Sequence, residues 1–339
     1  MAINRPTIRD VARQAGVSHQ TVSRVINGSE DVLPETRAVV EAAIEELGYR
    51  PSAIARSMAR GSTHTFAIIS PNLTDYTFAS VIEGAEVEAR QFNYFVLSSS
   101  ASDPQAFQGL VDELVGHRRV DGLIVINPYA DDRYQYIPKN FPVVFVGARS
   151  HDEKVCSISL DDEKVAYEAT RHLISLGHKR IGLVTGPMEE DCSQDRLVGF
   201  KLALAETGIL YDQFLVFEGD WSASSGSDAL ADFVKKGNLP TAVFAQNDRM
   251  AMGVMRAARD ANLKVPDQLS VIGVDDMPLS SYFDPPLTTM RQDMPLIGQE
   301  AIRKLIDLIQ NNTVEQTVLK LPAQLVVRQS TVKGGDLSS

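Results

Sequence analysis

The sequence predicts an α/β protein with an N-terminal three-helix helix-turn-helix head, followed by two doubly wound α/β lobes. Two observations support this fold class. Residues 7–26 have the periodicity and the capping residues of two short helices joined by a tight turn. From residue 64 onward, short apolar runs rich in β-branched residues alternate with helical stretches in two successive series. Such alternation is typical of parallel sheets that are covered by helices.

The run TIRDVARQAGVSHQTVSRVI, residues 7–26, carries signals for both ends of the first helix and for the start of the second. Thr7 can cap the first helix, and Asp10 stands three residues later, close to a capping-box pattern. Gly16 ends this helix because glycine tolerates the left-handed conformation, and Ser18 can cap the next. Apolar residues recur at helical spacing in both halves. A turn this short makes the helices cross steeply, as in a helix-turn-helix.

The second helix carries a polar stripe opposite its apolar one. Gln20, Arg24 and Asn27 lie at positions i, i+4 and i+7, with His19 and Ser23 beside them. Arginine can hydrogen-bond guanine, and glutamine or asparagine can hydrogen-bond adenine, in the major groove. The alternative is an ordinary solvated helix face. The coincidence of caps, a glycine turn and this stripe favours DNA recognition.

A third helix is predicted over residues 35–47 and ends at Gly48. In the linker that follows, Pro51 breaks the chain and Ser52 can cap a helix of about nine residues, which is marginal by itself in water. We predict that it orders only when DNA and a second subunit support it. Met58 could then wedge between base steps in the minor groove. The alternative is a plain flexible linker.

Composition and charge fit a soluble nucleic-acid binder once the chain is divided. The 339 residues are 44% hydrophobic, and the net charge is −11. Residues 1–62 carry eight Arg and seven Asp or Glu, a net charge of +1, so the remainder carries −12. The basic charge therefore lies beside the recognition helix, and the acidic remainder would repel DNA. Cys156 and Cys192 match neither a disulfide framework nor a metal spacing, and both are expected to be reduced and inert.

Eight runs are interpreted as buried parallel strands because they are short, apolar and β-branched. The first series is FAIIS (66–70), YFVLSS (94–99), VDGLIVI (120–126) and PVVFV (142–146), with helices such as 78–91 and 104–116 between them. The second is RIGLVT (180–185), FLVF (214–217), TAVFA (241–245) and LSVIGV (269–274). Two such series predict two lobes with a cleft between them.

Polar and aromatic residues follow the ends of several of these strands, where open α/β sheets bind ligands. They are Tyr76 to Phe78, Asn127, Arg196, Trp221, Asn247, Asp275 and Asp276. A carboxylate, an amide and a guanidinium can bond sugar hydroxyls, and an indole can stack on the C–H face of the ring. Each has an ordinary alternative. Asn247 or Asp248 could merely cap a helix, Arg196 could pair with a surface carboxylate, and Trp221 could be rim packing.

Enzyme and transport functions find little support. The chain has no Walker-type phosphate loop, no G-x-G-x-x-G, no H-E-x-x-H and no G-x-S-x-G, and these motifs carry the commonest chemistries of such folds. An enzyme would also leave residues 7–60 without a role. A sugar-binding protein for transport would need export, and the opening MAINRPTIRD lacks the apolar core of a signal peptide. The expected location is the cytoplasm.

The segments TIRDVARQAGVSHQTVSRVING and ETRAVVEAAIEELGYRPSAIARSM, with the strand series that follow, resemble the LacI/GalR family of bacterial repressors over essentially the whole chain. By this resemblance His19, Gln20 and Arg24 fall on base-reading positions, and Met58 stands where the family usually has a minor-groove leucine. Leu33 departs from the usual Ser cap before Pro34. The candidate DNA contacts are Thr7, Ser18, His19, Gln20, Thr21, Ser23, Arg24, Asn27, Ala55 and Met58.

The resemblance also implies lobes like those of periplasmic sugar-binding proteins, with the last segments crossing back into the first lobe. The expected domains are a head (1–50), a hinge (51–63) and a two-lobed effector and dimerisation domain (64–339), with lobes 64–161 plus 291–325 and 162–290 plus 326–332. The candidate effector contacts are Tyr76, Phe78, Asn127, Arg196, Trp221, Asn247, Asp275 and Gln292. Two positions depart from the family: Gly147 stands near a usual Asp, and Met294 replaces a residue that is often aromatic.

Taken together, these features predict a DNA-binding transcription regulator, a repressor controlled by a sugar or sugar derivative that is bound between the lobes. Because one recognition helix contacts only a few base pairs, a homodimer on a near-palindromic operator is expected. The tail VVRQSTVKGGDLSS has no apolar heptads, so no tetramerising coiled coil is expected. No cofactor, metal ion or membrane partner is expected.

Overall fold

The computed structural model describes residues 6–50, 61–129, 131, 133–147, 156–311 and 318–334. These residues form two units, residues 1–64 with 118–121 and residues 65–117 with 122–339. The predicted hinge helix, with Ala55 and Met58, lies outside the described residues.

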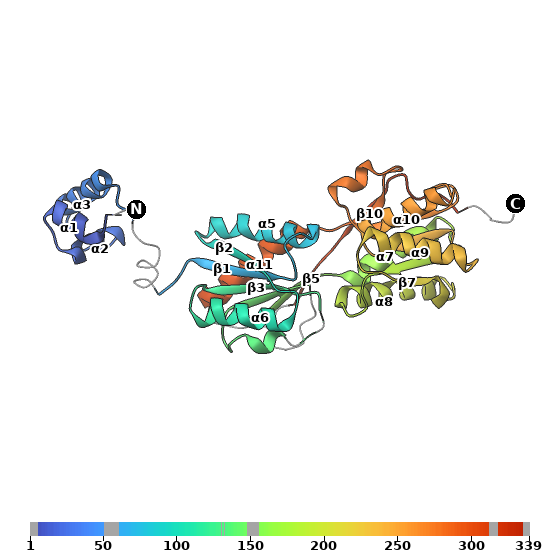
Figure 1. The fold of residues 1–339 in the computed structure, drawn as a ribbon, viewed down its shortest axis with the longest axis horizontal. Helices are drawn as coiled ribbons and strands as arrows, with labels where there is room; N and C mark the ends of the chain where they lie inside the picture. The colour runs from blue at the N-terminus through green and yellow to red at the C-terminus, as the bar shows by residue number, and fades with distance from the viewer. Residues whose placement is uncertain are drawn as a thin grey trace. The chain divides into compact units, whose positions relative to one another are not determined.

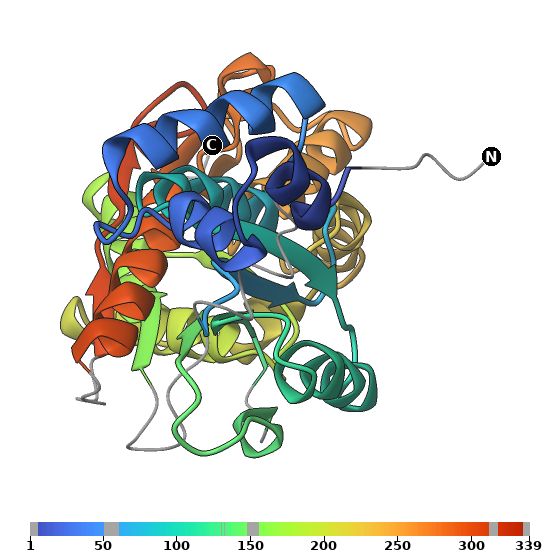
Figure 2. The same ribbon diagram turned by 90° about the vertical axis from the view of Figure 1, so that its left-hand side faces the viewer.

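The head consists of α1 (Ile8–Ala15), α2 (His19–Ile26) and α3 (Pro34–Leu47). The three helices lie close together in both views (Figure 1, Figure 2). Their common core is small and consists of Val11, Ala12, Val22, Val25, Val32, Val40 and Ala43. A helix-turn-helix with its apolar stripes turned inward is therefore present, as the sequence predicts.

The caps of the head helices follow from the residues named in the sequence. Asp10 accepts hydrogen bonds from the Thr7 amide at 2.9 Å and from the Thr7 hydroxyl at 2.7 Å. Gly16 ends α1 with φ of 66°, and the Ser18 hydroxyl accepts from the Thr21 amide at 3.1 Å. Leu33 gives α3 no side-chain cap, and the helix begins with Pro34 in its first turn instead, where the missing N–H of proline costs nothing.

The first lobe is built on a six-stranded sheet in the order β11-β5-β4-β3-β1-β2, and all of its pairings are parallel. Helices flank this sheet on both faces (Figure 1). Its elements are β1 (Thr65–Ser70), α5 (Tyr76–Gln91), β2 (Phe95–Ser100), α6 (Pro104–Val111), the π-helical turn η1 (Asp112–Gly116), β3 (Gly122–Ile126), η2 (Arg133–Tyr136), β4 (Val143–Val146), β5 (Cys156–Leu160), α11 (Met294–Asn311) and β11 (Val318–Leu321).

The second lobe has a six-stranded sheet in the order β12-β10-β9-β8-β6-β7, in which only the β10–β12 pair is antiparallel among the described strands. Its elements are α7 (Asp162–Ser175), β6 (Ile181–Thr185), α8 (Asp191–Glu206), η3 (Gln213–Leu215), β7 (Val216–Glu218), α9 (Ala223–Lys235), β8 (Ala242–Ala245), α10 (Asp248–Asp260), β9 (Ser270–Asp275), η4 (Pro278–Tyr282), β10 (Thr288–Arg291) and β12 (Gln324–Val326).

The chain crosses between the lobes three times. It passes from β5 to α7, from β10 to α11, and from β11 to β12. The last two crossings lie slightly away from their expected places, because Arg291 pairs with Asp275 and Gln324 pairs with Arg291 in the second sheet. A return of α11 and β11 to the first lobe completes its core, in which α5 and α11 pack on the strands.

Two glycines bring helix backbones into direct contact. A Cβ on Gly298 of α11 would lie 2.0 Å from the carbonyl oxygen of Val81 in α5. A Cβ on Gly253 of α10 would lie 1.9 Å from the carbonyl oxygen of Ala223 in α9. No side chain fits at such a distance, so these contacts fix how closely each helix pair lies together over its sheet.

Candidate functional site

The polar stripe of α2 lies on the surface of the head. Gln20, Arg24 and Asn27 are exposed, as is His19 at the start of the helix. Val22 and Val25 on the opposite side are buried. Within the described part of the chain, the side chains of Gln20 and Arg24 have no hydrogen-bonding or ion-pair partner. Their donors are therefore available to base edges.

The remaining predicted DNA contacts in the head are partly used by the fold itself. Thr7 and Ser18 cap α1 and α2, and the Ser18 and Thr21 hydroxyls lie 2.9 Å apart. The Asn27 amide donates to the Ser23 hydroxyl at 3.4 Å. Thr7 and Ser18 are nevertheless exposed. The Thr7 hydroxyl already donates to Asp10, so of the two only Ser18 has a hydroxyl hydrogen that can turn to a phosphate oxygen.

A second candidate site is a cavity of about 130 Å³ in the two-lobed unit. A single water needs roughly 10–15 Å³ on this measure, so the cavity has room for a small organic molecule. Residues from both sheets line it: Asp75, Thr77, Phe78, Val81, Ile126, Pro128, Val146, Gly147, Ser159, Leu160, Asp162, Glu190, Cys192, Arg196, Trp221, Asn247, Arg249, Asp275, Gln292, Met294 and Ile297.

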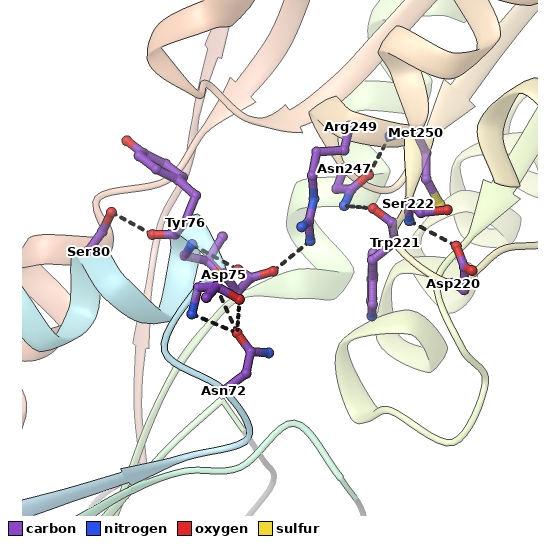
Figure 3. Close-up of polar contacts among 12 residues, drawn as sticks. Asn72, Asp75, Tyr76, Ser80, Asp220, Trp221, Ser222, Asn247, Arg249 and Met250 are labelled. Atoms are coloured by element: carbon purple, nitrogen blue, oxygen red, sulfur yellow. Dashed lines mark hydrogen bonds and ion pairs between the residues drawn. The ribbon is translucent and has the colours of Figure 1, made fainter. Parts of the chain in front are cut away.

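Six of the eight residues that the sequence indicates as effector contacts line this cavity, namely Phe78, Arg196, Trp221, Asn247, Asp275 and Gln292. The structure places the other two outside the lining. Tyr76 is exposed, and its ring points away from Trp221 and Asn247 (Figure 3). Asn127 is buried and organises its own loop, because its amide donates to the Tyr129 carbonyl at 3.0 Å and to Asp131 at 3.2 Å.

Arg196 forms a buried ion pair with Asp162. Its Nε lies 2.8 Å and its Nη2 2.7 Å from Asp162 Oδ1, and Nη1 donates to the Gln246 carbonyl at 2.5 Å. The two side chains are only 6% and 7% exposed. Burial raises the pKa of the Asp162 carboxyl, which Arg196 partly offsets. Burial alone would lower the pKa of Arg196, but Asp162 raises it above its usual value. The guanidinium therefore stays charged and fixed in place.

The indole of Trp221 is held at the cavity wall. Its N–H donates to a carboxylate oxygen of Glu190 at 3.0 Å, and the Arg196 guanidinium carbon lies 5.9 Å from the ring centroid. A Cβ on Gly186 would lie 2.1 Å from the ring, so only glycine allows this position. Burial raises the pKa of Glu190, while the hydrogen bond from the indole opposes that shift.

Asn247 has the capping role that the sequence left open. Its carbonyl oxygen accepts from the Met250 amide at 2.8 Å, at the start of α10. Its amide nitrogen donates to the Trp221 carbonyl at 3.1 Å, and Figure 3 shows both contacts. Since Asn247 also lines the cavity, the cap and the cavity wall are the same side chain.

Asp275 and Gln292 form the polar end of the cavity. The Gln292 amide donates to Asp275 at 3.3 Å. Burial and the nearby Asp248 raise the pKa of Asp275 well above its usual value. Burial also raises the pKa of Asp248 to about 6, although Ser280, Thr289 and the Met277 amide donate to it.

Among the described residues, Gln292 Oε1 is a buried acceptor that has no partner. An unsatisfied buried acceptor costs about 1–3 kcal/mol, so a ligand hydroxyl that donates here would gain correspondingly.

Sequence reasoning missed an ion pair that joins the two lobes. Arg249 Nη2, on α10, lies 2.6 Å from Asp75 Oδ2, at the start of α5 (Figure 3). Asp75 is itself a helix cap and accepts from the Thr77 amide at 2.9 Å. Asp162 and Glu190 were missed as well. Asp75, Glu190 and Arg249 follow strands that the sequence predicts, so the rule that found Arg196 could have found them, whereas Asp162 follows β5, which the sequence analysis did not predict.

The two departures from the resemblance both lie at the cavity, since Gly147 and Met294 line it. Cys192 lines it too, and burial raises the pKa of its thiol, which keeps the sulfur protonated and inert. In the part of the chain that the structure describes, no helix is long and apolar enough to cross a bilayer. No cluster of three or more potential metal ligands occurs among the same residues.

Comparison with known proteins matches two stretches of the chain to recognised domain families. Residues 7–52 match the family described as bacterial regulatory proteins, lacI family, and residues 170–331 match a periplasmic binding protein-like domain. The chain is 37% identical to catabolite control protein A of Priestia megaterium, over 96% of this chain and 99% of that protein. It is 33% identical to the transcriptional repressor CytR of Escherichia coli K12, over 96% of each chain.

The fold also matches a solved structure of the Lac repressor dimer bound to operator and the anti-inducer ONPF. The TM-score is 0.90 at 34% identity, over 97% of this chain and 100% of that one. By their names, CytR is a transcriptional repressor and the Lac repressor binds operator DNA. The chain therefore belongs to the lacI family of bacterial regulatory proteins and is a DNA-binding transcription regulator.

Proposed function

We propose that the protein is a homodimeric cytoplasmic repressor whose affinity for operator DNA is set by an uncharged sugar in the cavity between its lobes. The observation that favours an uncharged ligand is that the guanidinium groups lining the cavity are already paired with carboxyl groups. Its lining has four carboxyl groups (Asp75, Asp162, Glu190 and Asp275) but only two guanidinium groups (Arg196 and Arg249).

Both guanidinium groups are already paired, Arg196 with Asp162 and Arg249 with Asp75. A phosphate or carboxylate ligand would have to break one of these ion pairs or lie beside the remaining carboxyl groups. Separating the buried Arg196–Asp162 pair leaves a charge uncompensated, at a cost of about 3–5 kcal/mol. The Arg249–Asp75 pair is more exposed and costs less to separate. A neutral polyol meets no such penalty, because its hydroxyls can donate to carboxyl and amide oxygens and accept from the guanidinium groups.

The proposed contacts follow from this chemistry. Asp275, Asn247, Arg196 and Gln292 would bond hydroxyls, and the free Oε1 of Gln292 would accept one of them. Trp221 would stack on the apolar face of the ring. A related solved structure, 32% identical to this chain with a TM-score of 0.75, is a transcriptional regulator CelR–cellobiose complex. That protein supports a sugar as the class of effector here.

A panel of uncharged and phosphorylated sugars separates the two ligand classes. We expect at least one of glucose, ribose, galactose and cellobiose to raise the unfolding temperature, because a ligand that binds only the folded state stabilises it. Glucose 6-phosphate and ribose 5-phosphate are expected to give no shift at the same concentration. Calorimetric titration gives the affinity of any sugar that does. Stabilisation by the phosphosugars alone would contradict the proposal.

The dimer is supported by exposed apolar side chains on both lobes. Phe95 on the edge strand β2 is 74% exposed, and Tyr282 in η4 is 84% exposed. Leu97 and Leu279 beside them are exposed as well. Such patches mark protein contacts when they are contiguous. A two-fold dimer would present two heads to a near-palindromic operator, and the related Lac repressor is a dimer in its structure bound to operator.

Arg24→Ala tests the proposed base contacts. We expect affinity for the operator to fall by roughly 1–3 kcal/mol and the preference at one base pair to be relaxed. Fluorescence anisotropy measures the affinity and the base-pair preference, with duplexes that the wild-type protein selects from a random pool. The equivalence point of a titration at high duplex concentration should give two chains per duplex. Arg259→Ala, an exposed arginine on α10 of the second lobe, controls for charge. An equal loss on selected and random duplexes would make Arg24 a phosphate contact only.

The proposed mechanism is a population shift. A sugar contacts residues of both lobes and therefore favours one lobe arrangement over another, and the affinity for DNA changes only as far as that preference goes. The proposed division into head (1–50), hinge (51–63) and two-lobed domain (64–339) assigns one task to each part. The head binds DNA, the lobes bind sugar, and the hinge connects them.

A further inference from the structure

The carboxylate of Asp121 holds the chain segment that leads out of the linker. Asp121 Oδ1 accepts hydrogen bonds from the Thr63 amide at 2.7 Å and the Thr63 hydroxyl at 2.9 Å. Asp121 Oδ2 accepts from the Ser62 hydroxyl at 2.5 Å and the His64 amide at 2.8 Å. Both oxygens thus take two donors each, from three consecutive residues that are 57 to 59 positions away in the sequence.

This contact lies where two central strands of the first sheet begin. His64 directly precedes β1 and Asp121 directly precedes β3, and the register pairs Phe66 with Gly122. At its other end β3 reaches the cavity through Ile126 and Pro128. A five-residue strand spans about 16 Å. The Asp121 contact and the cavity therefore lie at opposite ends of the same paired strands.

Ordinary loop stabilisation would satisfy donors within one loop, as Asn72 does for Thr74 and Asp75. Asp121 instead binds residues on another segment, immediately after residue 61, where the chain turns at a glycine with φ of 71°. Hydrogen bonds to a charged acceptor are short and strong. Four of them on one carboxylate fix both the position and the direction of the segment.

We propose that Asp121 is a positioning residue that fixes the point where the linker leaves the first lobe, so that a shift of β1 and β3 caused at the cavity reaches the DNA-binding heads. This inference rests on the proposed function and names the residue through which that function acts. With the contact intact, the two heads of a dimer are held at a defined spacing. Without it, each head is tethered more loosely, and bringing both onto one operator costs more conformational entropy.

Asp121→Asn tests the proposal with the least change in size. The amide cannot accept from four donors and places an N–H₂ group against some of them. We expect affinity for a duplex selected by the wild-type protein from a random pool to fall at least tenfold, measured by anisotropy at fixed salt. If only the charge of Asp121 mattered, Asp121→Asn would raise the affinity for the duplex, because removing a negative charge strengthens the attraction to DNA.

Asp112→Asn is the matched control. Asp112 is exposed at the start of η1 in the same part of the lobe, and its substitution removes the same charge without touching the Ser62–His64 segment. Its affinity for the selected duplex should equal or slightly exceed that of the wild type. Equal affinities for the Asp121→Asn and Asp112→Asn variants would overturn the proposal.

A second variant keeps the test decisive if Asp121→Asn does not fold. Ser62→Ala combined with Thr63→Val removes two hydroxyl donors and leaves the carboxylate and the net charge unchanged, and it should weaken specific binding in the same direction but less. Binding to a random duplex should stay at the wild-type value in every folded variant, because each head is intact, and thermal unfolding checks that the lobes of each variant are folded. Loss of both kinds of DNA binding would make Asp121 merely structural.

The response to a sugar gives an independent readout. The sugar to use is the one in the panel that most raises the unfolding temperature of the wild-type protein, and it should also raise that of the Asp121→Asn protein. The ratio of the duplex affinities measured with and without this sugar should fall towards one in the Asp121→Asn protein. An unchanged ratio would count against the proposal. If the wild-type protein selects no duplex at all, the proposed function fails. If it does and Asp121→Asn behaves like the wild type, only this inference fails.

Discussion

Asp162→Ala is expected to lower the free energy of unfolding by about 3–5 kcal/mol, because it leaves the Arg196 guanidinium buried without a counter-charge. The two side chains meet through contacts of 2.7 and 2.8 Å and are almost fully buried. Asp162 accepts from two donors of Arg196, Nε and Nη2, and after the substitution only Nη1 would keep its partner, the Gln246 carbonyl. Chemical denaturation at neutral pH measures the loss as a lower midpoint at unchanged slope.

The double variant Asp162→Leu with Arg196→Met is the control for this expectation. Replacing a buried ion pair by apolar residues of similar volume is often neutral for stability, so most of the lost free energy should return. It should not return completely, since the Gln246 carbonyl then lacks its donor. A cost below about 1 kcal/mol for Asp162→Ala alone, in the range of exposed pairs, would show that water reaches the guanidinium.

Asp275→Ala is expected to abolish the response to sugar while operator binding remains. Asp275 lies at the carboxyl end of β9, has φ of 122° and lines the cavity beside Gln292. Its removal takes away a proposed hydroxyl partner and leaves the Gln292 amide without an acceptor. At least a hundredfold loss of sugar affinity is expected, on the order of 3 kcal/mol. Calorimetric titration with the panel sugar measures it.

The control for Asp275→Ala is Asp228→Ala, which removes the same charge from an exposed position on α9 of the same lobe. That protein should bind the sugar and the selected duplex as the wild type does. If Asp275→Ala instead lost DNA binding and kept its sugar affinity, the carboxyl group would serve the lobe arrangement and not the ligand.

The sequence predicts the parts of the fold that depend on local signals and not those that depend on contacts between distant residues. The head and eight strands follow from local periodicity, caps and apolar runs, and these elements are present. Two of the strands differ from the prediction, because β2 is mostly exposed and Phe214 and Leu215 belong to η3 instead of β7. Strand β10, Thr288–Arg291, gave no such signal because Thr288 and Thr289 are polar and yet fully buried. Their burial depends on distant partners, since Thr289 donates to Asp248 and Thr288 accepts from the Arg328 amide.

The same limit applies to the cavity. Strand ends indicate Arg196, Trp221, Asn247 and Asp275, but they do not show which side chains pair with one another. Asp162 is 34 residues from Arg196, and Asp75 is 174 residues from Arg249, and no local pattern encodes such pairs.

Tyr76 shows a further limit. It begins α5, where each residue turns the side chain by about 100°. Asp75, Thr77 and Phe78 line the cavity while Tyr76 does not, and the sequence alone does not say which of them faces inward.

The three crossings between the lobes set an order for folding during synthesis. The head is one continuous stretch of α1 to α3 and can fold as soon as it leaves the ribosome. The first lobe cannot, because α11 and β11 come after the whole of β6 to β10. Until they emerge, the face of its sheet that α11 covers stays open. Most strands of the second lobe are thus synthesised before the first lobe is complete. During that time the nascent chain exposes an apolar surface of the kind that chaperones bind.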